Sequence, residues 1–166
     1  NAAASGITYG HSEVAGGYTF EVAIPFDNLV EGDFAAVHNA RLGLEVMVGD
    51  ADVDTIREGR VAWNMEEGVD EAWAQPKLWG TIVLDDGSGV SLPAENPAVE
   101  MAPAPPVIDG AADAIWNDVP FREIRNTSSG TMDHSFAADF KALWDDGSLY
   151  LLVDVNDDTL RNDNKP

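Results

Sequence analysis

The feature that most constrains this chain is an alternation of apolar and polar side chains along short stretches. In GYTFEVAIPF (residues 17–26) and RLGLEVMVGD (residues 41–50), large apolar residues recur at every second position. Successive side chains of a β-strand point to opposite faces, so this period predicts strands with one buried face. LWGTIVLDDG (residues 78–87) indicates a third strand, which ends at the acidic residues and glycine that follow it.

A hairpin is predicted in the last third of the chain. SFAADFKALWDD (residues 135–146) and GSLYLLVDVNDD (residues 147–158) indicate two strands, joined by a DDGS turn at residues 145–148. Helical periodicity is weak throughout, apart from a short turn at residues 26–29. Several short strands joined by turn-rich loops predict an all-β fold, an antiparallel, jelly-roll-like β-sandwich of about immunoglobulin-domain size.

A proline- and alanine-rich stretch divides the chain. SLPAENPAVEMAPAPPV contains five of the nine prolines, which predicts an extended linker over residues 87–106. It separates two pieces, residues 1–86 and residues 107–166. Each piece alone would leave an apolar strand face bare, so we predict that both share one core. The residues expected in that core are Phe20, Val22, Leu44, Val46, Leu151 and Val153.

Charge and composition limit the classes of partner. The net charge of -21 disfavours nucleic acid and anionic membrane surfaces, because both would repel the chain. A neutral ligand, a cation or a basic partner remains compatible with it. The chain has no cysteine, which excludes disulfides and thiolate chemistry. No apolar run is long enough to span a bilayer, so no membrane insertion is expected. The oligomeric state stays open.

Two ordered sets of motifs resemble those of one protein family. GYTFEVAIPFDNL, LGLEVMVGDADVD, AWN and KLWGTIVL precede the linker, and VIDGAADAIWNDVP and FKALWDDGSLYLLVDVNDDTL follow it. The first set resembles the C-terminal half of a family 9 carbohydrate-binding module, and the second set resembles its N-terminal half. Because the halves are in swapped order, the chain is interpreted as the end of one module, a linker and the start of the next, or as one circularly permuted module.

The resemblance implies a fold and a function. Modules of this family are antiparallel β-sandwiches that bind sugars, often at chain ends, and are attached to secreted polysaccharide-degrading enzymes such as xylanases. We therefore expect a non-catalytic carbohydrate-binding module of a secreted xylan- or cellulose-degrading protein, located outside the cell or at its surface. Its expected partner is a neutral polysaccharide or oligosaccharide, and its parent protein could itself be a glycoside hydrolase.

A tryptophan among acidic residues is the candidate sugar platform. Trp73 follows Asp70 and Glu71, and an exposed indole matches the apolar face of a pyranose ring. The resemblance places one of the family's two sugar-holding tryptophans in this loop, with the second expected beyond residue 166. Asp70 stands where family members often have asparagine. Polar side chains would bond the sugar hydroxyls, and the expected set is Asp70, Glu71, Gln75 and Arg60. The other four tryptophans are predicted to pack.

Alternate carboxylates suggest a cation site. In GDADVDTIREG, Asp50, Asp52 and Asp54 are spaced like the start of a calcium-binding EF-hand loop, but the required later glycine and glutamate are missing. The resemblance adds that this family can bind structural calcium, so calcium is the candidate cofactor. NDDTLRND (residues 156–163) is a second, weaker candidate. In a chain with 30 acidic residues, both could equally be solvated loops.

No catalytic pattern is present in the sequence. The three histidines show no ligand spacing, and TSSG (residues 127–130) lacks the context of a hydrolase nucleophile. We therefore predict that the chain is not an enzyme. The alternatives to sugar binding are a structural β-sandwich spacer, or the N-terminal sandwich domain of an outer-membrane or surface protein. An exposed Trp73 would favour sugar binding, whereas a buried Trp73 would favour the spacer.

Overall fold

The computed structural model describes residues 6–29, 34–51, 58–89, 96–131 and 136–157. Within these ranges it is built of strands and three single-turn 3-10 helices, η1 (Phe26–Asn28), η2 (Pro76–Leu78) and η3 (Ala114–Trp116). Helices this short cannot cross a lipid bilayer. The strands are β1 (Thr8–Val14), β2 (Gly17–Pro25), β3 (Arg41–Leu44), β4 (Met47–Asp50), β5 (Gly59–Ala62), β6 (Gly80–Asp85), β7 (Ala98–Met101), β8 (Arg122–Ile124), β9 (Asn126–Gly130), β10 (Ala137–Trp144) and β11 (Ser148–Asn156).

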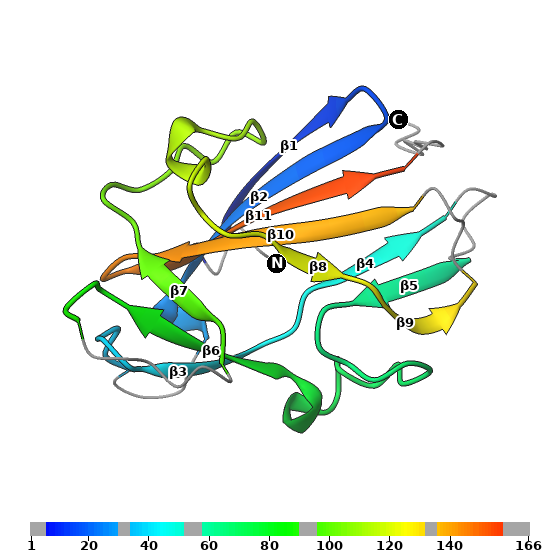
Figure 1. Cartoon of the computed structure of the whole chain (residues 1–166), viewed down its shortest axis with the longest axis horizontal. Coiled ribbons are helices and arrows are strands. Elements are labelled where there is room, and N and C mark those ends of the chain that lie inside the picture. Colours follow the sequence, from blue (N-terminus) through cyan, green and yellow to red (C-terminus); the bar gives the residue numbers. More distant parts are fainter. Residues whose placement is uncertain (1–5, 30–33, 52–57, 90–95, 132–135, 158–166) are drawn as a thin grey trace.

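The strands form two sheets that pack as a sandwich (Figure 1). The larger sheet has the order β1-β2-β11-β10-β7-β6-β3, with β8 also paired to β10, and the smaller has the order β4-β5-β9. Strand β2 pairs antiparallel with β11 along its whole length, and β5 pairs with β9. Each of these pairs joins a strand from before the predicted linker to one from after it. The all-β sandwich and the shared core are thus confirmed.

The core between the sheets contains most of the predicted residues. Val22, Val46, Leu151 and Val153 are buried in one cluster with residues from both sheets. Phe20 and Leu44 are only half-buried against that cluster. Phe20 lines an open cleft between the sheets and Leu44 lines a surface groove, so each has one side that no strand covers.

The structure differs from the sequence prediction inside the linker. Residues 98–101 form β7, which lies between β6 and β10 and is parallel to both in an otherwise antiparallel sheet. Its Val99 is fully buried. Pro97 and Pro103 flank the strand rather than interrupt it, so no ladder amide is lost. Part of the predicted linker is therefore a sheet strand. The assignment of residues 1–86 and 107–166 to swapped halves of a module stays a prediction.

A second apolar cluster covers the opposite face of the larger sheet. Trp116, carried by η3, packs there with Leu143, Tyr150 and Leu152. Its indole Nε1 donates to Oε1 of the buried Glu21 over 3.0 Å, and the backbone amide of Gly110 donates to Glu21 Oε2 over 2.9 Å. These bonds satisfy a carboxylate that β2 places inside the protein. The prediction that Trp116 packs is confirmed.

The segment around Asp109, which leads to η3, lies directly against the backbone of β1. A Cβ added at Gly10 of β1 would lie 2.5 Å from the carbonyl carbon of Asp109, a distance that side chains do not tolerate. Glycine is therefore required at this crossing for the chain around Asp109 to lie directly on β1. The segment after the predicted linker is thereby fastened to the first hairpin of the chain.

Candidate functional site

The loop between β5 and η2 turns Trp73 outward. The backbone amides of Ala74 and Gln75 both donate to the carbonyl of Glu71 over 3.0 Å, which makes residues 71–75 a tight turn. Ala72, 2% exposed, points inward to a small apolar cluster with Ala62 and Met65. The next side chain, Trp73, is 82% exposed. The buried alanine is thus the anchor of the loop, and the large aromatic residue beside it faces solvent.

Trp79 supports this turn from beneath. Its indole Nε1 donates to the carbonyl of Ala72 over 2.8 Å, and its ring lies against Gly43, where an added Cβ would be 3.4 Å from Cε3. The sequence prediction that Trp79 simply packs is wrong in part, because the residue is 37% exposed. Trp79 precedes β6 instead of lying in it, and it borders a groove of about 340 Å³ with Leu44 and Pro76.

The four polar residues predicted around Trp73 form two pairs. The Arg60 guanidinium on β5 donates to the Asp70 carboxylate as an ion pair, with both side chains mostly buried. The Gln75 amide donates to the Glu71 carboxylate across the turn that carries Trp73. Glu71 is exposed and Gln75 is half-buried, so this pair lies at the surface beside the indole. Arg60 and Asp70 brace the start of the loop from the sheet below it.

The remaining tryptophans are packed as predicted. The Trp63 ring meets the Phe140 ring edge-on, with centroids 5.3 Å apart and an interplanar angle of 77°. Trp144 is buried, and its Nε1 donates to the carbonyl of Asp85 over 3.2 Å. These rings join different strands of the core, which leaves Trp73 as the most exposed large hydrophobic side chain among the described residues.

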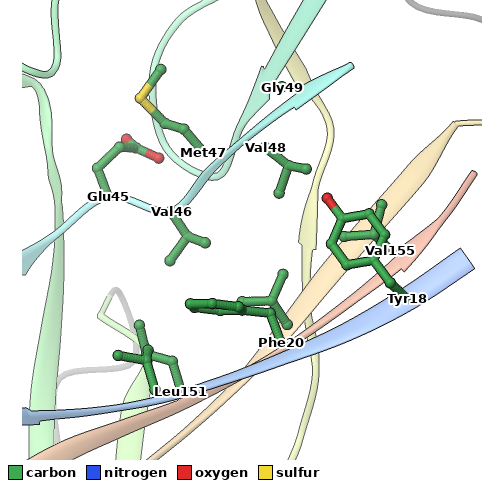
Figure 2. Close-up of a pocket in the computed structure, with 11 residues that line it drawn as sticks. Tyr18, Phe20, Glu45, Val46, Met47, Val48, Gly49, Leu151 and Val155 are labelled. Atoms are coloured by element: carbon green, nitrogen blue, oxygen red, sulfur yellow. The ribbon is translucent and has the colours of Figure 1, made fainter. Parts of the chain in front are cut away.

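A second hollow lies between the two sheets (Figure 2). It has a volume of about 400 Å³. Phe20 and Leu151 of the larger sheet face Val48 of β4 and Val46, which directly precedes β4, across this hollow. Sequence reasoning did not identify it. Most of its lining residues are aliphatic, with few groups that could bond sugar hydroxyls. This cleft is therefore a less suitable sugar site than the surface around Trp73.

Two titratable groups border this cleft. Burial raises the pKa of the Tyr18 hydroxyl, and the negative charges of Asp157 and Asp50 raise it further. Burial also raises the pKa of Glu45, against the effect of the Trp63 and Asn64 backbone amides that donate to it. Within the described ranges, Glu45 Oε2 has no hydrogen-bond partner. The cleft thus has polar groups at its rim and an apolar interior.

The predicted calcium loop is only partly described. Asp50 ends β4 and is buried, and its carbonyl accepts a 2.9 Å bond from the Glu58 amide, which closes the loop at its base. Asp52 and Asp54 lie outside the described residues, so the convergence of the three carboxylates stays a prediction. The second candidate, NDDTLRND, also lies largely outside them.

The family model "Carbohydrate family 9 binding domain-like" matches residues 1–87 and 108–166. The chain belongs to this family, and it is a non-catalytic carbohydrate-binding module of the kind found in polysaccharide-degrading proteins. The family match confirms the resemblance drawn from the motifs. The residues that fall between the two matched segments include β7.

Three relatives place this module in larger proteins. Exoglucanase XynX of Acetivibrio thermocellus is 30% identical over 151 residues, and endo-1,4-beta-xylanase A of Thermoanaerobacterium saccharolyticum is 28% identical over 147 residues. Each alignment covers 88% of this chain, but only 12% and 11% of the relative. Endo-1,4-beta-xylanase A of Thermotoga maritima is 41% identical over 59 residues, covering 36% of the chain and 6% of the relative. No solved structure matches the chain.

Proposed function

We propose that this module binds a neutral polysaccharide or oligosaccharide of the xylan or cellulose type by stacking one sugar ring on Trp73. The observation that carries the proposal is the 82% exposure of the indole on a turn that is anchored from below. An exposed tryptophan on a mobile support would lose entropy when a ligand ordered it. Here Ala72 and Trp79 hold the turn before the sugar arrives, which reduces that penalty.

The polar surround suits hydroxyl groups. Glu71 and Gln75 lie at the surface beside Trp73 and offer acceptor oxygens and an amide donor. Arg60 and Asp70 hold the loop through their ion pair and are proposed to complete the polar border. A neutral sugar needs no attraction between net charges, so stacking is compatible with a chain of net charge -21. Binding should therefore depend little on salt concentration.

The xylanase and exoglucanase relatives support the choice of glycan. By the same argument, we propose that the module works outside the cell or at its surface, where insoluble polysaccharide is met. The whole protein that carries it is proposed to degrade such polysaccharide through a domain other than this one.

The test is calorimetric titration of the chain with xylo- and cello-oligosaccharides. Covering part of the indole face is worth on the order of 1–3 kcal/mol, so Trp73→Ala should weaken binding about ten-fold or more. Phe121→Ala is the matched control, because Phe121 is also an exposed aromatic residue but lies between η3 and β8. Equal affinities for the wild type and Trp73→Ala would overturn the proposal. Absence of heat with every glycan would instead support the structural spacer.

We also propose that calcium binds the loop that begins at Asp50, with Asp52 and Asp54 as further ligands. Supporting this, the Asp50–Glu58 backbone bond closes the loop and keeps its two ends together. Bound calcium would raise the melting temperature through linkage. The melting temperature should rise in millimolar calcium and fall with a chelator, and the effect should vanish in Asp52→Asn. An unchanged melting temperature would refute it.

A further inference from the structure

We propose that His38, Asp85 and Asp86 bind a divalent first-row transition-metal ion such as Zn²⁺. His38 precedes β3, Asp85 ends β6, and Asp86 follows it. One ligand atom from each side chain lies within 4.8 Å of the other two. This group is separate from the Trp73 loop and from the predicted calcium loop, and the proposal does not depend on sugar binding.

The spacing of the ligand atoms suits a small cation. His38 Nδ1 lies 3.0 Å from Asp86 Oδ1 and 3.4 Å from Asp85 Oδ1. Zinc bonds of about 2.0–2.2 Å, at angles between tetrahedral and octahedral values, place neighbouring ligand atoms roughly 2.9–3.5 Å apart. Both distances fall in this range. An ion could therefore bind with little movement of the three side chains.

The backbone already holds these side chains together. The Asn39 amide donates to the Leu84 carbonyl and the Leu84 amide donates to the Ala40 carbonyl, both over 2.9 Å. These bonds fasten the turn before β3 to the end of β6. The Trp144 indole donates to the Asp85 carbonyl from the core side. One ligand thus ends a strand, and the other two lie in short segments that these bonds hold against strand ends, which limits their movement.

Backbone amides orient the two carboxylates. The Gly87 amide donates to Asp85 Oδ1 over 2.9 Å, and the Ser88 amide donates to Asp86 Oδ1 over 2.8 Å. Each carboxylate oxygen keeps a second lone pair that can bind a cation. The Asp86 amide lies 3.4 Å from His38 Nδ1, a long contact that a metal ion bound to Nδ1 would replace. The His38 side chain is only 13% exposed, so its ring is already held in place by its surroundings.

The donor set selects the kind of metal. One imidazole nitrogen with two carboxylate oxygens suits Zn²⁺ or a neighbouring first-row ion. Calcium prefers six to eight oxygen ligands and gains little from imidazole. Glu100 of β7 pairs with Asp85 of β6, and together with Asp86 they line a hollow of about 270 Å³. The Glu100 carboxylate adds to the negative potential that would attract a cation.

The test is titration of the chain with ZnCl₂ in a background of millimolar CaCl₂, which occupies sites made of oxygen alone. The expected result is one zinc ion per chain, with an affinity at least ten-fold lower in His38→Ala. His11→Ala is the matched control, because His11 is exposed on β1, and it should bind zinc as the wild type does. Co²⁺ added in place of zinc should give visible absorption bands that disappear in His38→Ala.

A second variant keeps the proposal testable if His38→Ala does not fold. Asp86→Asn keeps the shape of the side chain while removing one anionic ligand, and circular dichroism should show that it folds. Its zinc affinity should also fall at least ten-fold, and zinc should raise the melting temperature of the wild type more than that of either variant. Wild-type zinc affinity in both variants, or no one-to-one binding to the wild type, would overturn the proposal.

Discussion

Two segments of this chain share a local pattern and have opposite environments. DEAW (residues 70–73) and DAIW (residues 113–116) each place a tryptophan three residues after an aspartate, in a tight turn. Trp73 is 82% exposed, whereas Trp116 is 1% exposed. Trp116 lies on a sheet face and meets the carboxylate of Glu21. In the other turn the buried position belongs to Ala72, so the tryptophan points outward.

This comparison shows that neighbours in sequence do not decide whether a tryptophan is buried. Acidic residues flank both tryptophans in the sequence. Trp116 is buried because it meets Glu21, which lies 95 residues away in the chain. Trp73 is exposed because Ala72 is the residue that anchors its turn. A polar environment in the sequence is therefore a weak indicator of a binding platform unless the turn has another anchor.

The largest expected effect separates the two tryptophans by stability. Trp116→Ala should lower the free energy of unfolding by about 3–5 kcal/mol, because it opens a cavity and leaves Glu21 without its indole partner. Trp73→Ala should change it by less than about 0.5 kcal/mol, because an exposed side chain leaves no cavity. Urea denaturation measures both. Similar losses in the two variants would show that Trp73 also packs.

The next effect tests the partner of Trp116. Glu21→Ala removes an acceptor for the Trp116 indole and the Gly110 amide, so it should lower the free energy of unfolding by about 2–3 kcal/mol. Glu21→Gln keeps one carbonyl oxygen and should lower it less. Both are measured by urea denaturation. A loss in Glu21→Ala below that of Glu21→Gln would contradict this role.

A smaller effect concerns the support of Trp73. Trp79→Phe keeps an aromatic ring against Gly43 but deletes the indole bond to the Ala72 carbonyl. The free energy of unfolding should fall by about 0.5–1.5 kcal/mol. Amide hydrogen exchange should speed up at Ala74 and Gln75, whose bonds define the turn. Unchanged exchange there would mean that Ala72 alone anchors the loop.

The smallest effect is a pH dependence of the folding stability, caused by carboxyl groups near Trp116. Burial raises the pKa of Asp154 and of the facing Asp139, and the negative charges of Asp154 and Glu123 raise the pKa of Asp139 further. Lys141 opposes both shifts, and it is held by the Trp116 carbonyl, which accepts its Nζ at 2.7 Å. A carboxyl group whose pKa is higher in the folded state binds more protons there, so stability falls as pH rises above the ordinary pKa of 3.8.

Asp154→Asn cannot ionise and should escape this loss. Relative to the wild type, its urea midpoint should therefore be higher at pH 7 than at pH 4. Asp146→Asn is a suitable control, because Asp146 is exposed in the β10–β11 turn. A pH-independent difference between Asp154→Asn and the wild type would show that ionisation of Asp154 does not affect stability.

Much of the fold could be predicted because strand signals are local. Alternation over residues 17–25 and 148–156 matches β2 and β11, and their apolar faces form the predicted core. Strand β7 could not be predicted, because a stretch of four residues in a proline-rich segment is too short to show an alternation of apolar and polar side chains. It is a strand only because β6 and β10 lie on either side of it and pair with its backbone.

The candidate sugar site was predictable in part. Trp73 and its polar neighbours lie close together in the chain, and their motif resembles that of a known family. The support by Trp79 and the pairing of Arg60 with Asp70 depend on where the loop crosses the sheet. The proposed metal site was not predicted, because His38 and Asp86 are 48 residues apart and meet only where β3 pairs with β6.

The all-β class, the positions of β2, β10 and β11, and the family of this module follow from the sequence alone, since each depends on short-range periodicity or on ordered local motifs. The predicted strand at residues 41–50 is instead two strands, β3 and β4, in different sheets. Strand pairing, the exposure of each tryptophan and the convergence of polar side chains are properties of the folded chain. The physical reason is that burial and ligand geometry depend on contacts between residues far apart in the chain. Their distances become defined only when the sheets close around a common core.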